Sequence, residues 1–453
     1  MGVSVRFLGG AGTVTGSKFL IQVDSQNVMI DCGLFQGYKQ LRLRNWKPLP
    51  VDPQDVDAIV LTHAHIDHSG YVPVMVANGF NGPVHCTEGT SALCELLWLD
   101  SGYLQEREAK AANRGGYTRH KPARPLYDKQ QAERALPRLT PHSFDQWIDI
   151  TSDIRIRFRV AGHILGASIV EVDVGVKRLV FSGDLGRLDN PIMQPPARIE
   201  RADYLFLEST YGNRDHPRTD PEEALADIIS RTVKRGGSII IPSFAVGRAQ
   251  ALLFHLSNLM TRNDIPDLPV YLDSPMAIDA SDIFCRHNDG LRLTEPQARG
   301  SCGLATFTRS TEDSKALDIE KGQKIIISAS GMATGGRILF HLREYAPNPK
   351  NTILFAGFQA GGTRGARMLE GVEEIKIHGR YYPVRAEVAN LHMLSAHADR
   401  SEILTWLDGF QSPPRDTFIV HGEPDAADSL RHCIEEQKAW RVTVAEHNER
   451  VAL

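Results

Sequence analysis

The sequence predicts an α/β protein in which a domain of alternating strands and helices is inserted into a sheet-rich layered domain. The first observation is that residues 1–210 alternate short apolar runs with turns and contain few helical patterns. The second is a regular succession of strand and helix patterns after about residue 212. The third is a tail in which two helical patterns flank one strand. The predicted division is therefore 1–210, 211–389 and 390–453. The assignment of residues 390–453 to the sheet-rich domain as its second part, which makes 211–389 the inserted domain, rests on the candidate site residues considered below and not on composition.

Short runs rich in β-branched and aromatic residues, bounded by turn residues, predict the strands of the first part. These runs are residues 5–8, 19–21, 28–30, 58–61, 154–160, 168–174, 179–181 and 204–207. The clearest helical pattern among them covers residues 91–113.

The inserted domain is predicted as a parallel sheet covered by helices, because strands and helices alternate along it. Its predicted strands are residues 238–241, 270–272, 324–327 and 352–355, and its predicted helices cover 221–234 or begin at Gly247, Pro275 and Gly335. In the tail, residues 417–420 form the predicted strand.

Length and composition fit a globular protein of two or three domains, since the chain has 453 residues and 42% hydrophobic residues. No apolar stretch approaches a membrane span and the first residues do not resemble a signal peptide, so we expect a cytoplasmic protein without a membrane partner. The six cysteines form no C-x-x-C pair, which argues against a disulfide framework and a thiolate zinc site.

The net charge of −4 gives no overall sign of a nucleic-acid partner, but one stretch is basic. Between Arg107 and Arg138 lie the cations Lys110, Arg114, Arg119, Lys121, Arg124, Lys129 and Arg134, with only Glu108, Asp128 and Glu133 against them. The stretch is interpreted as a solvated helix face with a loop, or as a polyanion-binding surface if the active site requires one.

Three imidazoles and one carboxylate follow the predicted strand that ends near Thr62. Zinc prefers imidazole nitrogen and carboxylate oxygen where thiolates are absent. His63 and His65, two residues apart, can share one metal ion, while Asp67 and His68 can turn toward a second. The alternative is a polar surface loop with chance histidines.

Two further predicted strands are each followed by a turn of small residues and then by a residue that can bind a metal ion. These are Gly162-His163 and Gly183-Asp184. A single histidine after a strand is more often structural than a ligand. The glycine before each polar residue indicates close backbone approach or an unusual dihedral, which favours a functional role.

The pattern H-x-H-x-D-H, followed by His163 and Asp184, resembles the metallo-β-lactamase superfamily, and Asp31 in I-D-C-G resembles its first motif. The resemblance implies an αββα sandwich with two Zn²⁺ per chain. It implies that His63, His65 and His163 hold one zinc ion, that Asp67 and His68 hold the other, that Asp184 bridges both, and that Asp31 orients the site.

Glu208 in L-E-S-T-Y-G, His397 in S-A-H-A-D and His421 in V-H-G-E resemble motifs A, B and C of the β-CASP nucleases. The chain thereby resembles bacterial and archaeal ribonucleases similar to the nuclease subunit of the cleavage and polyadenylation specificity factor. The resemblance implies an inserted β-CASP domain and hydrolysis of single-stranded RNA by a hydroxide held between two metal ions, as an endonuclease with or without 5′-to-3′ exonuclease activity.

In the mechanism expected from this resemblance, His421 would complete the second zinc site. Four other residues would be catalytic. His397 would be the general acid, oriented by Glu208, while Asp31 and Asp67 are the other catalytic carboxylates.

Two blocks in the inserted domain, residues 241–250 and 330–337, also look like family motifs. Arginine can pair bidentately with RNA phosphates, and backbone N–H groups at a predicted helix start suit a phosphate. The predicted substrate-binding residues are Ser243, Arg248, Ser330, Gly331, Thr334, Gly335 and Arg337. Since no accessory RNA-binding domain is recognised, we expect surface or homodimer contacts to hold the RNA.

The glycine-rich run from Gly9 to Lys18 is interpreted as a tight loop beside the site, because its spacing differs from that of a phosphate-binding P-loop. Two other functions stay open at this point. One is a small-molecule zinc hydrolase of the thioesterase or lactonase type, and the other is a catalytically inactive RNA-processing scaffold.

Overall fold

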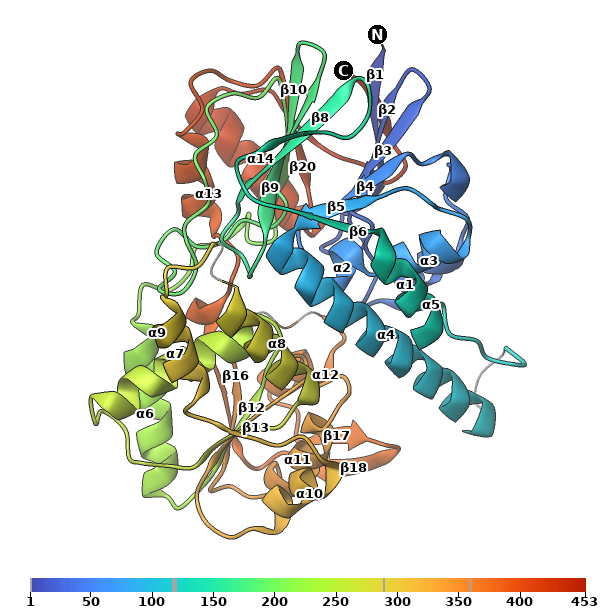
Figure 1. The fold of residues 1–453 in the computed structure, drawn as a ribbon. Coiled ribbons are helices and arrows are strands. Elements are labelled where there is room, and N and C mark those ends of the chain that lie inside the picture. Colours follow the sequence, from blue (N-terminus) through green and yellow to red (C-terminus); the bar gives the residue numbers. More distant parts are fainter. Residues whose placement is uncertain (1, 116–119, 288–289, 358, 360) are drawn as a thin grey trace. The chain divides into compact units, whose positions relative to one another are not determined.

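The computed structural model describes residues 2–115, 120–287, 290–357, 359 and 361–453 (Figure 1). Arg119 of the basic stretch lies outside these residues. The chain divides into two compact units. Unit 1 comprises Met1–Asp215, Asp289–Arg292 and His397–Leu453, and unit 2 comprises His216–Asn288 and Leu293–Ala396. The predicted boundaries after residues 210 and 389 lie a few residues before these limits.

Unit 1 contains two seven-stranded sheets. The first has the order β22 (Arg450–Ala452), β1 (Val3–Gly9), β2 (Lys18–Val23), β3 (Gln26–Ile30), β4 (Ala58–Val60), β5 (Val84–Thr87) and β6 (Leu139–His142). The second has the order β21 (Val442–Val444), β20 (Asp416–Val420), β11 (Tyr204–Glu208), β10 (Lys177–Phe181), β9 (Ser168–Val174), β8 (Ile154–Val160) and β7 (Trp147–Asp149).

The two sheets of unit 1 pack face to face through buried aromatic and aliphatic side chains. Phe7 and Phe19 of the first sheet meet Phe206 of the second, and the rings of Phe181 and Phe206 stack with centroids 4.2 Å apart. This face-to-face stacking fills the core between the sheets.

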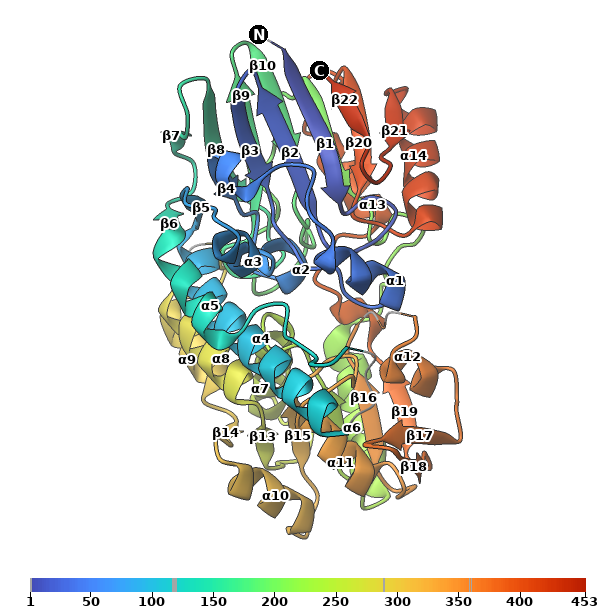
Figure 2. The same cartoon turned by 90° about the vertical axis from the view of Figure 1, so that its right-hand side faces the viewer.

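Helices cover the outer faces of both sheets in unit 1 (Figure 2). On the first sheet, α4 (Glu88–Gly115) contacts β5 and β6, while α3 (Val72–Ala77) and α5 (Lys129–Ala135) pack beside it. On the second sheet, α14 (Pro424–Lys438) contacts β20 and β21, and α13 (Arg400–Leu407) is anchored by Trp406, whose indole N–H donates to the carbonyl of Ala197 at 2.9 Å. The expected αββα sandwich is therefore confirmed.

Unit 2 has a six-stranded sheet in which every neighbouring pair is parallel. The order is β14 (Thr306–Phe307), β13 (Val270–Leu272), β15 (Ile325–Ser328), β12 (Ile239–Pro242), β16 (Thr352–Phe355) and β19 (Glu387–Asn390). Alternate residues of β12 enter different cores, Ile239 and Ile241 one and Ile240 the other, so both faces of the sheet are covered. The helices are α6 (Pro221–Lys234), α7 (Arg248–Thr261), α8 (Pro275–Arg286), α9 (Glu295–Cys302), α10 (Thr311–Ile319), α11 (Ile338–Tyr345) and α12 (Arg364–Leu369), and β17 (Glu374–Ile377) pairs with β18 (Arg380–Pro383).

One predicted helix start was wrong. The helix expected from Gly335 begins at Ile338, because the residues before it form a turn in which the N–H of Ala333 donates to the carbonyl of Ser330. The predicted helix over residues 221–234 is confirmed by α6. Among the described residues, no helix is both long and apolar enough to cross a membrane.

Candidate metal centre

The candidate ligands of unit 1, and Asp31 that orients one of them, lie at the carboxyl ends of strands in both sheets. Asp31 follows β3 and His63 follows β4, two neighbouring parallel strands. In the other sheet, Asp184 follows β10 and His421 follows β20, which are both parallel to β11. Parallel strands end at the same edge, so these side chains meet there. The backbone turns sharply at this edge, with φ of 56° at Asp31 and 48° at His421.

The first cluster is formed by His63, His65, His163 and Asp184, whose donor atoms all lie within 4.8 Å of one another. Oδ2 of Asp184 is 3.5 Å from Nε2 of His63 and 3.6 Å from Nε2 of His163. Nδ1 of His65 lies 3.0 Å from Nε2 of His63. Three imidazoles and one carboxylate therefore face a common point.

The second cluster is formed by Asp67, His68 and His421, again with donor atoms within 4.8 Å of one another. The other carboxylate oxygen of Asp184, Oδ1, is 3.3 Å from Nε2 of His68 and 3.5 Å from Nε2 of His421. The two oxygens of Asp184 thus face different clusters. That is the arrangement a bridging carboxylate requires.

Burial sets the protonation of this centre. Desolvation lowers the pKa of His63 well below its ordinary value and lowers that of His65 to about 4. Burial opposes the charge on Asp184, but the neighbouring imidazoles, His421 first, hold its pKa well below the usual range. Neutral His63 and His65 beside an ionised Asp184 are in the protonation states that metal ligands need. Burial also opposes the charge on His68, but Asp184 and Asp31 raise the pKa of His68 well above its ordinary value.

Asp31 orients His68 of the second cluster through a hydrogen bond. Its carboxylate accepts hydrogen bonds from the backbone N–H of Thr62 at 2.7 Å and from the Thr62 hydroxyl at 2.9 Å. Nδ1 of His68 donates to Asp31 Oδ2 at 2.7 Å, which turns Nε2 toward Asp184. Nε2 of His68 and Oδ1 of Asp184 are buried and have no hydrogen-bond partner among the described residues. A zinc ion fits here, because imidazole and carboxylate donors are present and buried acceptor atoms remain to be satisfied.

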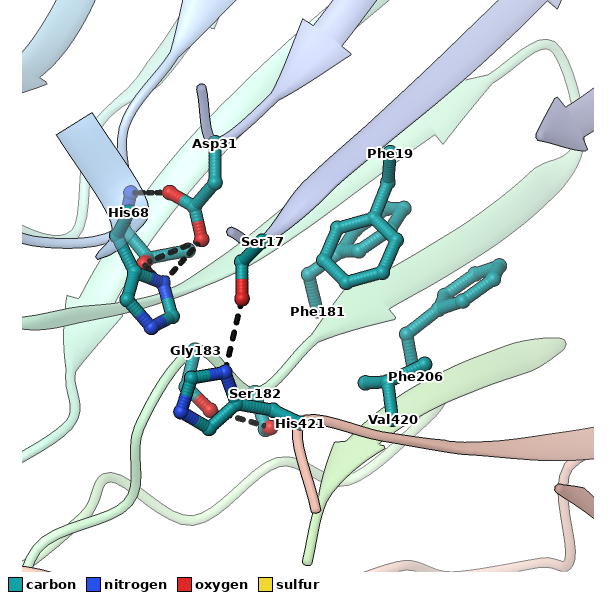
Figure 3. A pocket seen from close by; sticks show the side chains of 11 residues that line it. Ser17, Phe19, Asp31, His68, Phe181, Ser182, Gly183, Phe206, Val420 and His421 are labelled. Carbon is teal, nitrogen blue, oxygen red and sulfur yellow. Dashed lines mark hydrogen bonds and ion pairs between the residues drawn. The ribbon is translucent and has the colours of Figure 1, made fainter. Parts of the chain in front are cut away.

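Ser17 contacts the second cluster, although the sequence did not indicate it as a site residue. Figure 3 shows it in a small cavity together with His68 and His421. Its side chain is fully buried, and its Oγ lies 2.8 Å from Nδ1 of His421. The sequence placed the loop that ends at Ser17 beside the site, but no local signal indicated this contact.

Glu208 and His397 form a pair beside the first cluster. Nδ1 of His397 donates to Oε1 of Glu208 at 3.2 Å, and the backbone N–H groups of Leu185 and Thr210 fix the two carboxylate oxygens at 2.8 and 3.1 Å. Burial opposes protonation of His397, but Glu208 and Asp184 raise its pKa above the ordinary value. The site therefore contains a histidine that favours its protonated form, in contrast to His63.

Several known proteins and family models are similar to this chain. Three family models match the chain: the metallo-beta-lactamase superfamily at residues 11–230, the Beta-Casp domain at 249–368, and the Zn-dependent metallo-hydrolase RNA specificity domain at 381–445. Ribonuclease TTHA0252 of Thermus thermophilus is 34% identical, with 92% of each chain covered. The transcription termination factor FttA of Methanosarcina mazei is 31% identical over 94% of this chain and 68% of its own length.

The chain belongs to the β-CASP family of the metallo-β-lactamase superfamily. The expected family is thereby confirmed, and the enzyme class is a metal-dependent hydrolase. A crystal structure of a protein of unknown function from Enterococcus faecalis covers 100% of both chains with a TM-score of 0.58 and 14% identity, which shows a shared fold.

The predicted substrate residues of the β-CASP domain lie in unit 2, most of them in the loop between β15 and α11. The hydroxyls of Ser330 and Thr334 are 3.0 Å apart, and the Thr334 N–H donates to Ser330 Oγ at 3.2 Å. A Cβ atom on Gly331 would lie 2.7 Å from the ring of Phe244, so only glycine fits there, whereas a Cβ on Gly335 would meet nothing within 4 Å. Because α11 begins later than predicted, these N–H groups do not form a helix N-terminus.

The other three predicted β-CASP substrate residues are more enclosed. Ser243 is buried and its hydroxyl donates to the carbonyl of Phe244 at 3.0 Å, while the Arg248 guanidinium lies against Gly357. Arg337 donates to Asp273 at 2.8 Å and to the carbonyls of Thr308 and Arg309 at 3.0 and 2.7 Å. These bonds favour a structural role for Arg337, and its contact with RNA stays a prediction.

Proposed function

We propose that this β-CASP protein is a ribonuclease that hydrolyses phosphodiester bonds of single-stranded RNA and holds two zinc ions. The observation that carries the proposal is Asp184, whose two carboxylate oxygens face two separate donor clusters. The Glu208–His397 pair beside them and a relative named as a ribonuclease support RNA cleavage rather than a small-molecule reaction.

The proposed ligand sets follow the two clusters. His63, His65 and His163 would hold one ion, Asp67, His68 and His421 would hold the other, and Asp184 would contact both. When bound, two such ions supply an activated water at neutral pH and Lewis-acid stabilisation of the phosphate charge. Asp31 fixes the ring orientation of His68 through the hydrogen bond at Nδ1.

His397 is the proposed general acid. The leaving 3′ oxygen needs a proton as the phosphodiester bond breaks, and a positioned imidazolium can supply it. Glu208 holds Nδ1 of His397, so that Nε2 is the atom that would deliver the proton. The carboxylate of Glu208 is itself fully buried and held by two backbone N–H groups, which keeps it rigid.

The deciding experiment is digestion of an end-labelled single-stranded RNA, with and without a 5′-monophosphate, by the zinc-loaded protein. Internal fragments at early times indicate endonuclease activity, whereas mononucleotides that depend on the 5′-monophosphate indicate 5′-to-3′ exonuclease activity. Removing zinc with a chelator should abolish both, and adding zinc should restore them. Hydrolysis of a nitrophenyl ester without any RNA cleavage would contradict the proposal and favour a thioesterase or lactonase.

Two further expectations from the sequence, a cytoplasmic location and a homodimer, belong to the same proposal. The homodimer is tested by sedimentation equilibrium of the purified protein at several concentrations. The location is tested by cell fractionation.

A further inference from the structure

A basic and aromatic segment follows the Asp31 motif in unit 1. From Cys32 to Val51 the chain contains no acidic residue, and its four cations are Lys39, Arg42, Arg44 and Lys47. They lie in and around the short helix α1 (Lys39–Arg42) and the 3₁₀ helix η1 (Leu43–Trp46). We call Tyr38–Lys47 the basic segment.

The basic segment exposes large apolar side chains to solvent. Tyr38 is 60% exposed, Trp46 is 58% exposed and Leu43 is 48% exposed. Exposed aromatic rings interleaved with cations are the composition that binds single-stranded nucleic acid, because bases stack on the rings while phosphates pair with the cations. Tyr38, Leu43 and Trp46 lie within nine residues of one another and do not enter the core of unit 1. Packing of the core therefore does not explain these large apolar side chains.

The cations of the basic segment are not neutralised. None of the four forms an ion pair with a carboxylate of the part of the chain that the structure describes. Arg44 instead lies over the ring of Phe35, 5.4 Å from its centroid. The positive charge of the segment affects His447. Burial lowers the pKa of His447, and Arg44, Lys18 and Lys47 lower it further, to about 4.

Hydrogen bonds and close packing connect the basic segment to the loop that carries Asp67. The side chain of Asn45, only 8% exposed, accepts from the N–H of Phe35 at 2.9 Å and donates to its carbonyl at 2.8 Å. Two residues earlier, Gly33 packs so closely on the ligand loop that a Cβ atom would lie 1.6 Å from the carbonyl oxygen of Asp67. Figures 1 and 2 accordingly place α1 close to α2 (Ile66–Ser69), the helix that carries Asp67 and His68.

We propose that the basic segment binds the nucleotides next to the cleaved bond of a single-stranded RNA, with Tyr38 and Trp46 stacking on bases and the four cations pairing with phosphates. The inference rests on the proposed ribonuclease function and names a surface that holds its substrate. Charge complementarity favours RNA as the ligand of this surface, because a polyanion can form ion pairs with all four cations at once. The attachment through Asn45 and Gly33 keeps this surface at a constant distance from Asp67.

The test uses the zinc-loaded full chain and two double variants, Tyr38→Ala with Trp46→Ala, and Arg42→Gln with Arg44→Gln. The aromatic pair should raise the KM for a long oligouridylate, and the Kd for the same RNA carrying a fluorophore, by about 10- to 100-fold. The arginine pair should flatten the dependence of log Kd on log salt by about 0.7 for each phosphate that is no longer neutralised. Cleavage of bis(4-nitrophenyl) phosphate, which carries no neighbouring nucleotides for the segment to bind, should keep its wild-type rate in both.

A matched control is Arg441→Gln, because Arg441 is an exposed arginine of unit 1 that is paired with Asp416 at 2.8 Å. It should leave the Kd and the salt dependence unchanged. All substituted side chains are surface groups, and thermal unfolding checks that every variant is folded.

The outcomes separate this inference from the proposed function. If the wild type cleaves RNA and both double variants bind and cleave the oligouridylate as it does, the segment is not an RNA surface and the function stands. If the wild type cleaves no RNA but the variants weaken its binding, the function fails and the surface stands. If the variants instead change the sedimentation of the protein without RNA, the segment contacts a second copy of the chain and the inference is overturned.

Discussion

The hydroxyl of Ser17 and Nδ1 of His421 lie 2.8 Å apart although 404 residues separate them in sequence. For Nε2 of His421 to direct its lone pair toward the metal centre, Nδ1 must carry the hydrogen, and Ser17 Oγ is placed to accept it. The backbone N–H of Ser17 also donates to the carbonyl of Asp67 at 2.8 Å. One residue of the glycine-rich loop therefore holds two of the three ligands of the second cluster.

We expect Ser17→Ala to weaken binding at the second metal site, because the orientation of His421 is no longer fixed. Loss of an outer hydrogen bond to a metal-bound histidine typically lowers metal affinity by about 10- to 100-fold. Chelator competition followed by elemental analysis should show one zinc ion released before the other. The control is Ser281→Ala, which removes a buried hydroxyl of unit 2, whereas Ser17 lies in unit 1. This variant should keep both ions. Equal affinities in wild type and Ser17→Ala would rule out this role.

His397→Ala should lower turnover of RNA by about 10²–10⁴ if His397 is the general acid. The zinc content should stay near that of the wild type, because His397 is not needed to complete either cluster. Single-turnover kinetics and elemental analysis of the same sample measure both quantities. A proportional loss of zinc would instead identify His397 as a ligand. Glu208→Gln should give a smaller loss, since the imidazole remains but its orienting charge is removed.

Much of this site was predictable because each ligand follows a strand in a short local pattern. The strands ending near Thr62, Val160 and Phe181 were visible as apolar runs, and the glycines before His163 and Asp184 marked sharp turns that the structure contains, with φ of 74° at Gly162 and 54° at Gly183. Local patterns report backbone conformation well, because their causes are local.

Contacts between distant segments were not predictable in the same way. The Ser17–His421 contact depends on how β2 and β20 lie in two different sheets, which no single segment encodes. Arg337 was predicted as an RNA contact from its motif, yet its donors reach Asp273 and two carbonyls brought near by the folding of unit 2. The basic segment was not predictable from the sequence, because the exposure of Tyr38 and Trp46 is a property of the folded chain.

Charge reversal on the outer face of α4 tests the second candidate RNA surface. Arg107 and Arg114 are exposed there, and among the residues that the structure describes Lys110 is paired only with Glu106, one turn away. Changing Arg107 and Arg114 to Glu should raise the Kd for single-stranded RNA and flatten its salt dependence by about 0.7 for each phosphate that the helix no longer neutralises. An unchanged salt slope would mean that this helix face is only solvated.

A buried histidine in unit 2 makes stability depend on pH. His341 donates through Nε2 to Asp273 at 2.8 Å and through Nδ1 to Asp318 at 2.6 Å, and Asp273 is also held by Arg337. Burial alone would lower the pKa of His341, but the two carboxylates outweigh it and raise the pKa to about 9. Folding therefore favours the protonated imidazole.

The consequence is a stabilisation that is fully present below the pKa of an unfolded histidine, about 6.5, and is lost as the pH rises through about 9. A shift of this size corresponds to a free energy on the order of 3 kcal/mol. We expect His341→Gln to be less stable than the wild type at pH 6, and the difference in free energy of unfolding to shrink as the pH approaches 9.5. Urea denaturation followed by circular dichroism at several pH values measures this difference, in which groups common to both proteins cancel. A difference that stays constant from pH 6 to pH 9.5 would show that His341 is neutral in the folded protein and that Asp273 is held by Arg337 and Ser314 instead.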